Sequence, residues 1–323
     1  MLIWDDTLWV VLMALAFDAV VGDPDWLWRK FPHPVVWIGG AIDKFEQFFN
    51  RESWSQLQRK IAGIFVVFGL MTGAGIIGFF LAEGLRQTGV GIVAEGLLAS
   101  TLIAQRSLYQ HVQRVARSFT EGGLVAARRQ VAMIVGRDPE QLDAAGVSRA
   151  AIESTAENFS DGIVAPVFWL MLLGLPGLIA YKAINTADSM IGHRSARYQS
   201  FGWAAARLDD LVNLAPARIS GLLIALVAPV VHGSIAKSLT IMFRDAPKHR
   251  SPNAGWPEAA MAGALNIALA GPRRYAEGMV NDPYLNAEAR KEATPDDIKH
   301  ALDLFVAACL LQAAIYAALL LLS

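Results

Sequence analysis

Four stretches of the chain carry no charged residue, and each is about as long as a membrane segment. They contain 18 to 22 residues and lie at Ile61–Ala82, Gly162–Tyr181, Ile219–Ala236 and Leu304–Ser323. A helix needs about 20 apolar residues to cross the hydrocarbon core of a bilayer. The first and last stretches therefore predict transmembrane helices.

The two middle stretches contain residues that interrupt a helix. The run 162–181 includes the segment Gly174-Leu-Pro-Gly177, which predicts a break or a re-entrant hairpin. The run 219–236 is shorter and contains a proline and a histidine. Either run could therefore fail to form a straight span.

Two weaker candidates each include one carboxylate. The segment Thr7–Gly22 contains Asp18, and Thr88–Gln105 contains Glu95. An ionisable side chain is costly at membrane depth, which predicts a functional role or a contact with another helix.

The distribution of basic residues gives a partial topology. The acidic pair Asp5-Asp6 precedes the first apolar segment, whereas a signal peptide needs a basic leading region. We therefore expect an uncleaved first segment with its N-terminus outside and the 23–60 loop inside. Seven Arg in 105–161 and nine Lys and Arg in 237–303 predict cytoplasmic positions. The basic residues of 182–218 leave the side of that segment open.

The remaining elements are predicted to be helical. Gln105–Arg137 has a basic polar face and is typical of a membrane-surface helix. Thr294 begins a helix that leads into Ile298–Leu322, because Thr caps the start and Pro occupies the first position. No period-two strand pattern is present. The sequence predicts one all-α domain over residues 1–323, a multi-pass integral membrane bundle of about four to six membrane segments, some re-entrant. The basic face comprises Arg106, Arg114, Arg117, Arg128 and Arg129.

Composition supports a membrane protein and excludes several other classes. The 323 residues are 54% hydrophobic and 18% charged, whereas soluble domains have about 25% charged residues. With 28 basic and 29 acidic residues, the chain lacks the basic excess of an electrostatic nucleic-acid binder. The single cysteine, Cys309, excludes an internal disulfide and a Cys-rich metal site.

Familiar nucleotide motifs are absent or misplaced. Gly73-Ala-Gly-Ile-Ile-Gly78 matches a dinucleotide-binding pattern but lies inside an uncharged run with no preceding strand. Packing of small residues between helices, with Gly69 added, explains this pattern better. No Walker A, HExxH or GxSxG motif is present. A bound phosphate would therefore not be held by a P-loop.

The first of four polar clusters follows the first apolar segment. It contains Asp23 and then His33, which lies between Pro32 and Pro34. The prolines restrict the backbone, and a neutral imidazole could serve as a base or a ligand. A rigid interfacial turn is the alternative.

The second cluster is the segment 149–161, which contains Arg149 and Asn158. Glu153 and Glu157 are four residues apart and share a helical face that Asp161 continues. Neighbouring carboxylates repel one another unless a cation is present, so Mg²⁺ is a natural candidate. A solvated acidic face is the alternative.

The third cluster is the segment 182–218. Three polar residues repeat at three-residue spacing on one helical face, and an Asp-Asp-x-x-Asn pattern follows an arginine. This pattern suits a divalent ion that bridges phosphate oxygens, although surface charge pairs look similar. The residues are Lys182, Asn185, Asp188, Arg207, Asp209, Asp210, Asn213 and Arg218.

The fourth cluster is the loop 243–258, which contains three prolines. Its basic residues could clamp a carboxylate or a phosphate, while an ordinary surface loop is the alternative. If the four clusters form one site, an unbroken span at 162–181 would separate the second from the third. We therefore expect that run to be broken, or the bundle to enclose a polar cavity. The fourth cluster comprises Arg244, Asp245, Lys248, His249, Arg250, Ser251, Asn253 and Glu258.

Long motifs in these clusters resemble the CobD/CbiB family of adenosylcobinamide-phosphate synthases. They include FDAVVGDP, PHPVVWIG and VGRDPEQLDAAGVSRAAIESTAENFSDGIVAPVF. YKAINTADSMIGHRSARYQSFGWAAARLDDLVNLAPARISG and RDAPKHRSPNAGWPEAAMAGALNIALAGPRRY follow, and the motifs extend from about residue 14 to 303. Phe159 and His193 stand where the family more often has Thr and Tyr. These two departures affect what can be expected of the local contacts at those positions, and they do not affect the resemblance to the family.

The resemblance implies a multi-pass inner-membrane ligase of cobalamin (vitamin B12) biosynthesis. Such enzymes attach aminopropanol or its phosphate to the corrinoid adenosylcobyric acid through an amide bond, and amide formation of this kind normally uses ATP and Mg²⁺. The expected partners are these substrates, the lipid bilayer and other membrane enzymes of late cobalamin synthesis, with no nucleic acid.

The residue types suggest roles for the side chains of the four clusters. Acyl transfer from a phosphorylated carboxylate needs a metal, a positive clamp and a base. The candidate metal ligands are Glu157, Asp161, Asp209 and Asp210. The candidate catalytic residues are Asp23, His33, Glu153, Lys182, Asp188 and His249. The candidate substrate- or phosphate-binding residues are Arg149, Asn158, Asn185, Arg207, Asn213, Arg218, Arg244, Asp245, Ser251, Asn253 and Glu258.

Two other functions stay open from the sequence. The Asp-Asp-x-x-Asn pattern also suits a Mg²⁺-dependent membrane transferase acting on a diphosphate, although the second Asp-rich motif expected of such an enzyme is absent. A non-enzymatic membrane signalling or transport protein could use the same polar groups for binding alone.

Overall fold

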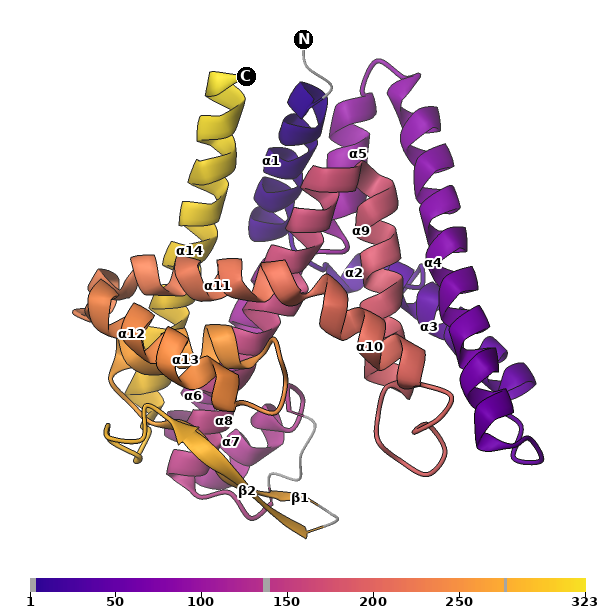
Figure 1. Ribbon diagram of the computed structural model, residues 1–323. Coiled ribbons are helices and arrows are strands. Elements are labelled where there is room, and N and C mark those ends of the chain that lie inside the picture. Colours follow the sequence, from indigo (N-terminus) through magenta and orange to yellow (C-terminus); the bar gives the residue numbers. More distant parts are fainter. Residues whose placement is uncertain (1–3, 136–139, 276–277) are drawn as a thin grey trace. The chain divides into compact units, whose positions relative to one another are not determined.

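The computed structural model describes residues 4–135, 140–275 and 278–323, which are mostly helical (Figure 1). This confirms the predicted all-α class. The chain divides into two compact units that interleave along the sequence. Unit 1 consists of Met1–Ala104, Ala165–Asn213 and Tyr316–Ser323, and unit 2 of Gln105–Val164 and Leu214–Ile315. The expectation of one membrane domain over the whole chain stays a prediction.

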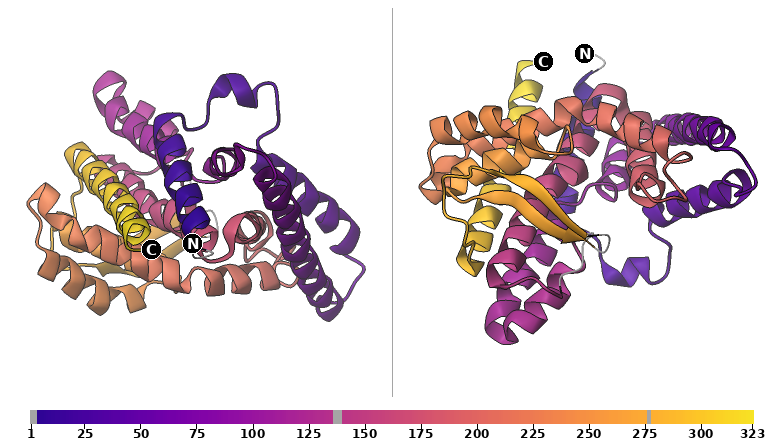
Figure 2. Two further views of the ribbon diagram at one scale, coloured as in Figure 1. Left: turned by 90° about the horizontal axis from the view of Figure 1, so that it is seen from above. Right: turned by 60° about the horizontal axis from the view of Figure 1, so that its bottom comes forward.

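Unit 1 is built from helices. In chain order they are α1 (Trp4–Val20), α2 (Asp25–Trp28), α3 (Pro34–Phe49), α4 (Gln56–Arg86), α5 (Gly91–Ser100), α9 (Ala165–Ile191) and α10 (Trp203–Val212). Helix α4 contacts α3, α5, α9 and α10. Its long apolar sequence and its capping box at Ser55 explain why it begins sharply and continues unbroken (Figures 1 and 2).

Unit 2 combines helices with one short hairpin of strands. Its elements are α6 (Gln105–Glu121), α7 (Gly123–Val131), α8 (Ala144–Phe159), the π-helix η1 (Ser160–Val164), α11 (Leu214–Leu226), η2 (Ala228–Val231), α12 (Ile235–Asp245), η3 (Ala246–Lys248), α13 (Gly255–Leu265), β1 (Leu269–Tyr275), β2 (Gly278–Leu285) and α14 (Pro295–Leu322), whose end from Tyr316 onward belongs to unit 1. The buried helix α13 contacts α8, α11 and α12, and therefore forms the centre of this unit.

Three helices within the described residues are long and apolar enough to cross a membrane. They are Gln56–Arg86, Pro295–Leu322 and the helical stretch Ala144–Ile191, which is interrupted at Gly174. These helices confirm the spans predicted at 61–82 and 304–323. Helices α1 and α5 are shorter, with 17 and 10 residues.

The run 219–236 does not form a straight span. Helix α11 ends at Leu226, a short 3-10 turn follows, and His232 adopts a left-handed conformation with φ 59°. Pro229 lies inside that turn, where a regular α-helix would lack its backbone donor. The run is therefore divided between two helices that belong to the same unit.

Helix α9 turns back on itself at Gly174, as the glycine and proline pattern predicted. Gly174 has φ 66°, a left-handed conformation that is easy only for glycine. A Cβ on Gly177 would lie 2.6 Å from the carbonyl oxygen of Trp169. In a straight helix these residues would be about 12 Å apart along the axis. The two arms of α9 therefore form a hairpin (Figure 1).

The tip of this hairpin packs on α4 through a glycine of the Gly73–Gly78 motif. A Cβ on Gly78 would lie 2.6 Å from the Cα of Pro176, whereas a Cβ on Gly69 or Gly73 would meet nothing within 4 Å. The small-residue packing predicted for this motif is thus present at Gly78. The other two glycines face open space within the described structure.

Replacing Gly78 with Leu is expected to destabilise the protein much more than the matched change Gly73→Leu. The larger side chain at Gly78 would push against the backbone of Pro176, and overpacking of this kind costs about 1 to 3 kcal/mol. Thermal unfolding of the detergent-purified variants measures the difference. Equal melting temperatures for the two variants would contradict the hairpin packing.

The carboxylate predicted at membrane depth in the fifth helix has a partner on another helix. Glu95 is buried, and its Oε2 accepts a hydrogen bond of 3.0 Å from Nε of Arg86 at the end of α4. Asp18 on α1 is also buried. For Glu95, the contact with another helix accounts for the buried charge.

Two sequence predictions for unit 2 require correction. The helix expected over 105–137 breaks at Gly122 and Gly123, where Gly123 has φ 66°, and its predicted end at Arg137 lies outside the described residues. The strands β1 and β2 were not predicted, because prolines and glycines disrupt their side-chain alternation. They pair antiparallel with a bulge near Ala270.

Candidate functional site

Three carboxylates come together in unit 1 at the end of α9 and in α10. Asp209 Oδ1 accepts a hydrogen bond of 3.3 Å from Nδ2 of Asn185, one turn before Asp188. Asp209 also interacts electrostatically with Asp188 and Asp210. The polar residues of the end of α9 and of α10 therefore lie near one another, and the site roles predicted for them stay predictions.

The environment of Asp209 makes a lone negative charge costly. Burial, together with the negative charge of Asp188, raises the pKa of Asp209 to about 7 despite hydrogen bonds from Asn185 and Asn213. Asn213 is itself held by Tyr181, whose hydroxyl donates to its Oδ1 at 3.0 Å. A proton or a cation at this carboxylate would relieve the repulsion.

Basic groups accompany these carboxylates in unit 1. Arg207 Nη1 lies 3.1 Å from Oδ2 of Asp210, and Lys182 lies half-buried on the second arm of α9. Both residues belong to the predicted third cluster. Arg207 thus lies beside one carboxylate of the cluster, and Lys182 lies on the same helix as Asn185 and Asp188.

The carboxylates around Asp209 are oxygen ligands of the kind that Mg²⁺ accepts. No three His, Cys, Asp or Glu side chains in the described part of the chain are grouped so that they could hold a metal alone. Mg²⁺ commonly takes only one or two protein carboxylates, with water and substrate phosphates completing the shell. The metal role assigned to Glu157, Asp161, Asp209 and Asp210 stays a prediction.

Asp23 and His33, the residues of the first predicted cluster, contact each other in unit 1. Nε2 of His33 lies 3.3 Å from Oδ1 of Asp23, while Nδ1 accepts the backbone N–H of Val35 at 3.2 Å and caps α3. The ring of Trp28 packs edge-on against His33. Both ring nitrogens are therefore engaged, so His33 would have to release one contact before acting as a base.

In unit 2, Asp245 is the centre of a dense group of charges. Its buried carboxylate accepts hydrogen bonds from Nε and Nη2 of Arg244, both at 2.9 Å, from Nζ of Lys248 at 2.6 Å and from the backbone of Asn286 at 2.8 Å. Asn286 in turn donates to the carbonyl oxygens of Ala262 and Ile267. Asp245 therefore joins α12 to the segment after β2.

Replacing Asp245 with Asn is expected to destabilise the protein by about 2 kcal/mol near neutral pH. Burial raises the pKa of Asp245, but hydrogen bonds from Arg244, Lys248 and Asn286 lower it further, to about 2. A depressed pKa stabilises the fold above the unfolded value of 3.8, and this gain is lost as the pH falls toward 2. The free energies of unfolding of the wild type and the variant, measured from pH 7 to 2, should become equal in acid.

The loop after Asp245 places a histidine beside a buried glutamate. Nε2 of His249 lies 3.7 Å from Oε1 of Glu258 in the first turn of α13, and its Nδ1 accepts the backbone N–H of Ser251 at 3.1 Å. Ser251 Oγ accepts the backbone N–H groups of Asn253 and Ala254. Local hydrogen bonds thus fix the conformation of this polar loop. From the sequence alone, an ordinary surface loop was the alternative.

An arginine from α11 completes this polar loop. The guanidinium of Arg218 lies 4.5 Å from the centre of the Trp256 ring, and its Nη1 donates to Oδ1 of Asn253 at 3.5 Å. The stacked arginine retains further donors that could bind a carboxylate or a phosphate. Four residues of the fourth predicted cluster therefore contribute, with Arg218, to one polar group in unit 2: His249, Ser251, Asn253 and Glu258.

The second predicted cluster divides into different environments. Oε1 of buried Glu153 accepts the backbone N–H of Ala270 at 2.7 Å, where Ala270 has a left-handed φ of 57°. Glu157 is exposed, and Asp161 lies in the π-helix that follows α8. Glu153 therefore stabilises the bulge of β1, and the shared site predicted for the three carboxylates stays a prediction.

The two remaining residues of this cluster make contacts with the backbone. Nη2 of Arg149 donates to the carbonyl oxygen of Lys291 at 2.8 Å, and its guanidinium lies over the ring of Tyr284. The side chain of Asn158 donates to the backbone and hydroxyl oxygens of Ser154. Neither contact tests the substrate-binding role predicted for these residues.

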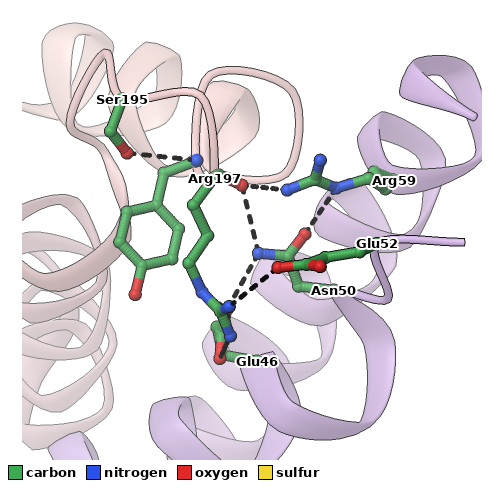
Figure 3. Close-up of polar contacts among 7 residues, drawn as sticks. Glu46, Asn50, Glu52, Arg59, Ser195 and Arg197 are labelled. Carbon is green, nitrogen blue, oxygen red and sulfur yellow. Dashed lines mark hydrogen bonds and ion pairs between the residues drawn. The ribbon is translucent and has the colours of Figure 1, made fainter. Parts of the chain in front are cut away.

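One polar group in unit 1 was missed from the sequence. Arg197 forms a double hydrogen bond with Glu46, and Asn50 and Arg59 surround the pair (Figure 3). A useful signal was available, because Glu46 follows the buried Ile42 by four residues on α3. A carboxylate at such a position indicates a buried partner.

Together, the helices and their polar groups define a helical membrane protein that contains ordered clusters of charged side chains. The family model for CobD/Cbib protein matches residues 11–305. Proteins named "Cobalamin biosynthesis protein CobD" are similar over most of their length. One from Sinorhizobium sp is 50% identical over 309 residues, which is 95% of this chain and 96% of the relative.

Two further relatives carry the same name. The Brucella anthropi protein is 50% identical over 92% of this chain and 91% of its own, and the Rhodobacter capsulatus protein is 48% identical over 92% of each. The chain therefore belongs to the CobD/CbiB family, and it has a role in cobalamin biosynthesis. No solved structure gives a significant match.

Proposed function

We propose that the protein is a membrane ligase that forms an amide bond between adenosylcobyric acid and aminopropanol or aminopropanol phosphate. The family match over residues 11–305 supports the corrinoid pathway. The observation that carries the proposed chemistry is the grouping of Asp188, Asp209 and Asp210 with Asn185. Such oxygen donors suit a phosphate-bound divalent cation better than they suit an inert surface.

The proposed reaction has two steps. A carboxylate oxygen of the corrinoid attacks the γ-phosphorus of ATP, and ADP leaves. The nitrogen of the amine then attacks the acyl carbon, the C–O bond to phosphate breaks, and inorganic phosphate leaves with the amide formed. The amine must lose its extra proton before it attacks, which requires a nearby acceptor.

In this proposal the polar group of unit 1 binds the phosphate groups of ATP. Asp209 and Asp210 would hold Mg²⁺, which when bound would neutralise phosphate charge and orient the phosphoryl group. Lys182 and Arg207 are the basic side chains of the same unit that could bind phosphate oxygens. Their ordered neighbours reduce the reorganisation needed when substrate binds.

The polar loop of unit 2, taken by itself, is proposed to bind the amine substrate. Arg218, stacked on Trp256, has the donors to bind a carboxylate or the phosphate of the amine. The pair formed by His249 and Glu258 is the proposed proton acceptor for the ammonium group. The inner membrane is the proposed location, with the three apolar helices as the anchors.

Reconstitution tests this function. The purified protein in lipid nanodiscs is incubated with adenosylcobyric acid, ATP, Mg²⁺ and either aminopropanol or aminopropanol phosphate. We expect a corrinoid product whose mass corresponds to amide formation with loss of water, and no product when Mg²⁺ is chelated. No amide with either amine would contradict the proposal and favour a transferase or a non-enzymatic role.

A further inference from the structure

Arg197 lies in the loop that joins α9 to α10, and its side chain is held by a carboxylate from α3. Its Nε donates to Oε1 of Glu46 at 2.8 Å, and its Nη2 donates to Oε2 at 2.9 Å (Figure 3). This two-point geometry fixes the plane of the guanidinium as well as its position. Only 7% of Glu46 is exposed, whereas the side chain of Arg197 is 48% exposed, so the pair is buried on its carboxylate side.

The backbone of Arg197 is held independently of its side chain. Its carbonyl oxygen accepts hydrogen bonds from Nδ2 of Asn50 at 3.2 Å and from Nη2 of Arg59. Asn50 also donates to Glu46 at 2.8 Å and accepts from Nε of Arg59 at 2.7 Å. The four residues therefore form a closed network, which we call the Arg197 latch.

The loop held by the latch is tightly fitted to its surroundings. A Cβ on Gly202 would lie 1.6 Å from the carbonyl oxygen of Ile191, and a Cβ on Gly63 of α4 would lie 1.9 Å from that of Phe201. The side chain of Phe201 is fully buried. The two ends of the loop thus meet closely, and the loop rests directly on α4.

This loop connects the two halves of the carboxylate group. Asp188 lies one turn before the end of α9, and Asp209 lies in the second turn of α10. The loop between them also exposes His193 and Arg194. Any movement of residues 192–202 would therefore change how the two helices present their carboxylates.

We propose that Arg197 is a positioning residue, whose latch to Glu46, Asn50 and Arg59 holds the 192–202 loop so that Asp188 and Asp209 act on the same substrate. This inference rests on the proposed function of the Asp209 group. It assigns no contact with substrate to Arg197. An ion pair that served only local stability would not need to hold both the side chain and the carbonyl oxygen of one residue.

The test compares Arg197→Lys and Glu46→Gln with the control Glu52→Gln. Lysine keeps the charge but cannot form the two-point contact, and glutamine removes the charge from the same position. Glu52 is the control because it is a second carboxylate near the same guanidinium that is open to solvent. Its Oε1 lies 3.8 Å from Nη1 of Arg197, and its side chain is 87% exposed. All variants are made in the full-length protein and purified in the same detergent.

Hydrogen exchange of the loop is the first measurement. In the wild type and Glu52→Gln we expect protection of the Gln199 and Gly202 amides, which donate to Ser195 and Tyr198 carbonyls. We expect at least about tenfold faster exchange in the two latch variants, and wild-type exchange in Asp209→Asn. Unchanged protection in both latch variants would overturn the latch.

Amide synthesis is the second measurement. Small displacements of reacting groups lower rates strongly, so we expect kcat to fall about 10- to 100-fold in both latch variants with KM for the corrinoid changed less than threefold. Glu52→Gln should keep the wild-type rate. Faster loop exchange with an unchanged kcat would overturn the positioning role while leaving the proposed function intact. An inactive wild type would instead overturn the proposed function, and the role of Arg197 with it.

Discussion

Asp209→Asn is expected to lower kcat for corrinoid amide formation by about 1,000-fold while the protein remains folded in the membrane. The substitution keeps the shape of the side chain but removes the charge that would hold a phosphate-bound cation. The hydrogen bond from Asn185 could still form to the amide oxygen, so the local fold should persist. The rate of product formation, followed by mass spectrometry, and the melting temperature of the protein in detergent are measured on the same preparation. Together they separate a loss of catalysis from a loss of folding.

Asp43→Asn is the matched control for this experiment. Asp43 is an exposed carboxylate on α3 in the same unit, so its loss should leave the rate unchanged. Asp210→Asn should also impair synthesis, although its pairing with Arg207 makes some loss of local order part of the effect. Full activity in both the Asp209 and Asp210 variants would contradict the metal assignment.

His249→Asn is expected to lower kcat by about 100-fold, with a smaller effect on KM. The imidazole and the buried carboxylate of Glu258 lie 3.7 Å apart and are proposed to accept the ammonium proton together. Groups that act as a unit show non-additive losses. The double variant with Glu258→Gln should therefore be little slower than the worse single variant, as steady-state kinetics will show.

The control for the histidine is His300→Asn, which changes an exposed imidazole on α14. Its kinetic constants should match the wild type. If the fold-loss of kcat in the double variant equals the product of the two single fold-losses, shared proton transfer is contradicted. Such a result would indicate that His249 and Glu258 act through separate effects on loop structure and substrate binding.

Much of the fold follows from physical rules that act locally. An uncharged run of 22 residues at 61–82 leaves few alternatives to a membrane helix, and α4 contains it. The break at Gly174 was predictable because glycine tolerates φ 66° and Pro176 lacks a backbone donor. The strands β1 and β2 were not predictable, because prolines and glycines disrupt their side-chain alternation and their pairing includes a bulge.

The candidate site was predictable where its residues share one element. The proximity of Asn185 and Asp209 could only be suspected, since it depends on how the 192–202 loop folds. The role of Glu153 was misjudged because its partner, the N–H of Ala270, lies 117 residues away. The Arg197 latch was missed for the same reason, because its members come from three separate segments.

The central claim is that this membrane protein activates a corrinoid carboxylate with ATP for attack by an amine. The most direct test uses adenosylcobyric acid with ¹⁸O in its reacting carboxyl group, together with ATP, Mg²⁺ and the amine. The proposed route predicts one ¹⁸O atom in the inorganic phosphate for each amide formed, as measured by mass spectrometry. Amide formation with ¹⁸O in AMP, or in no phosphate at all, would contradict it.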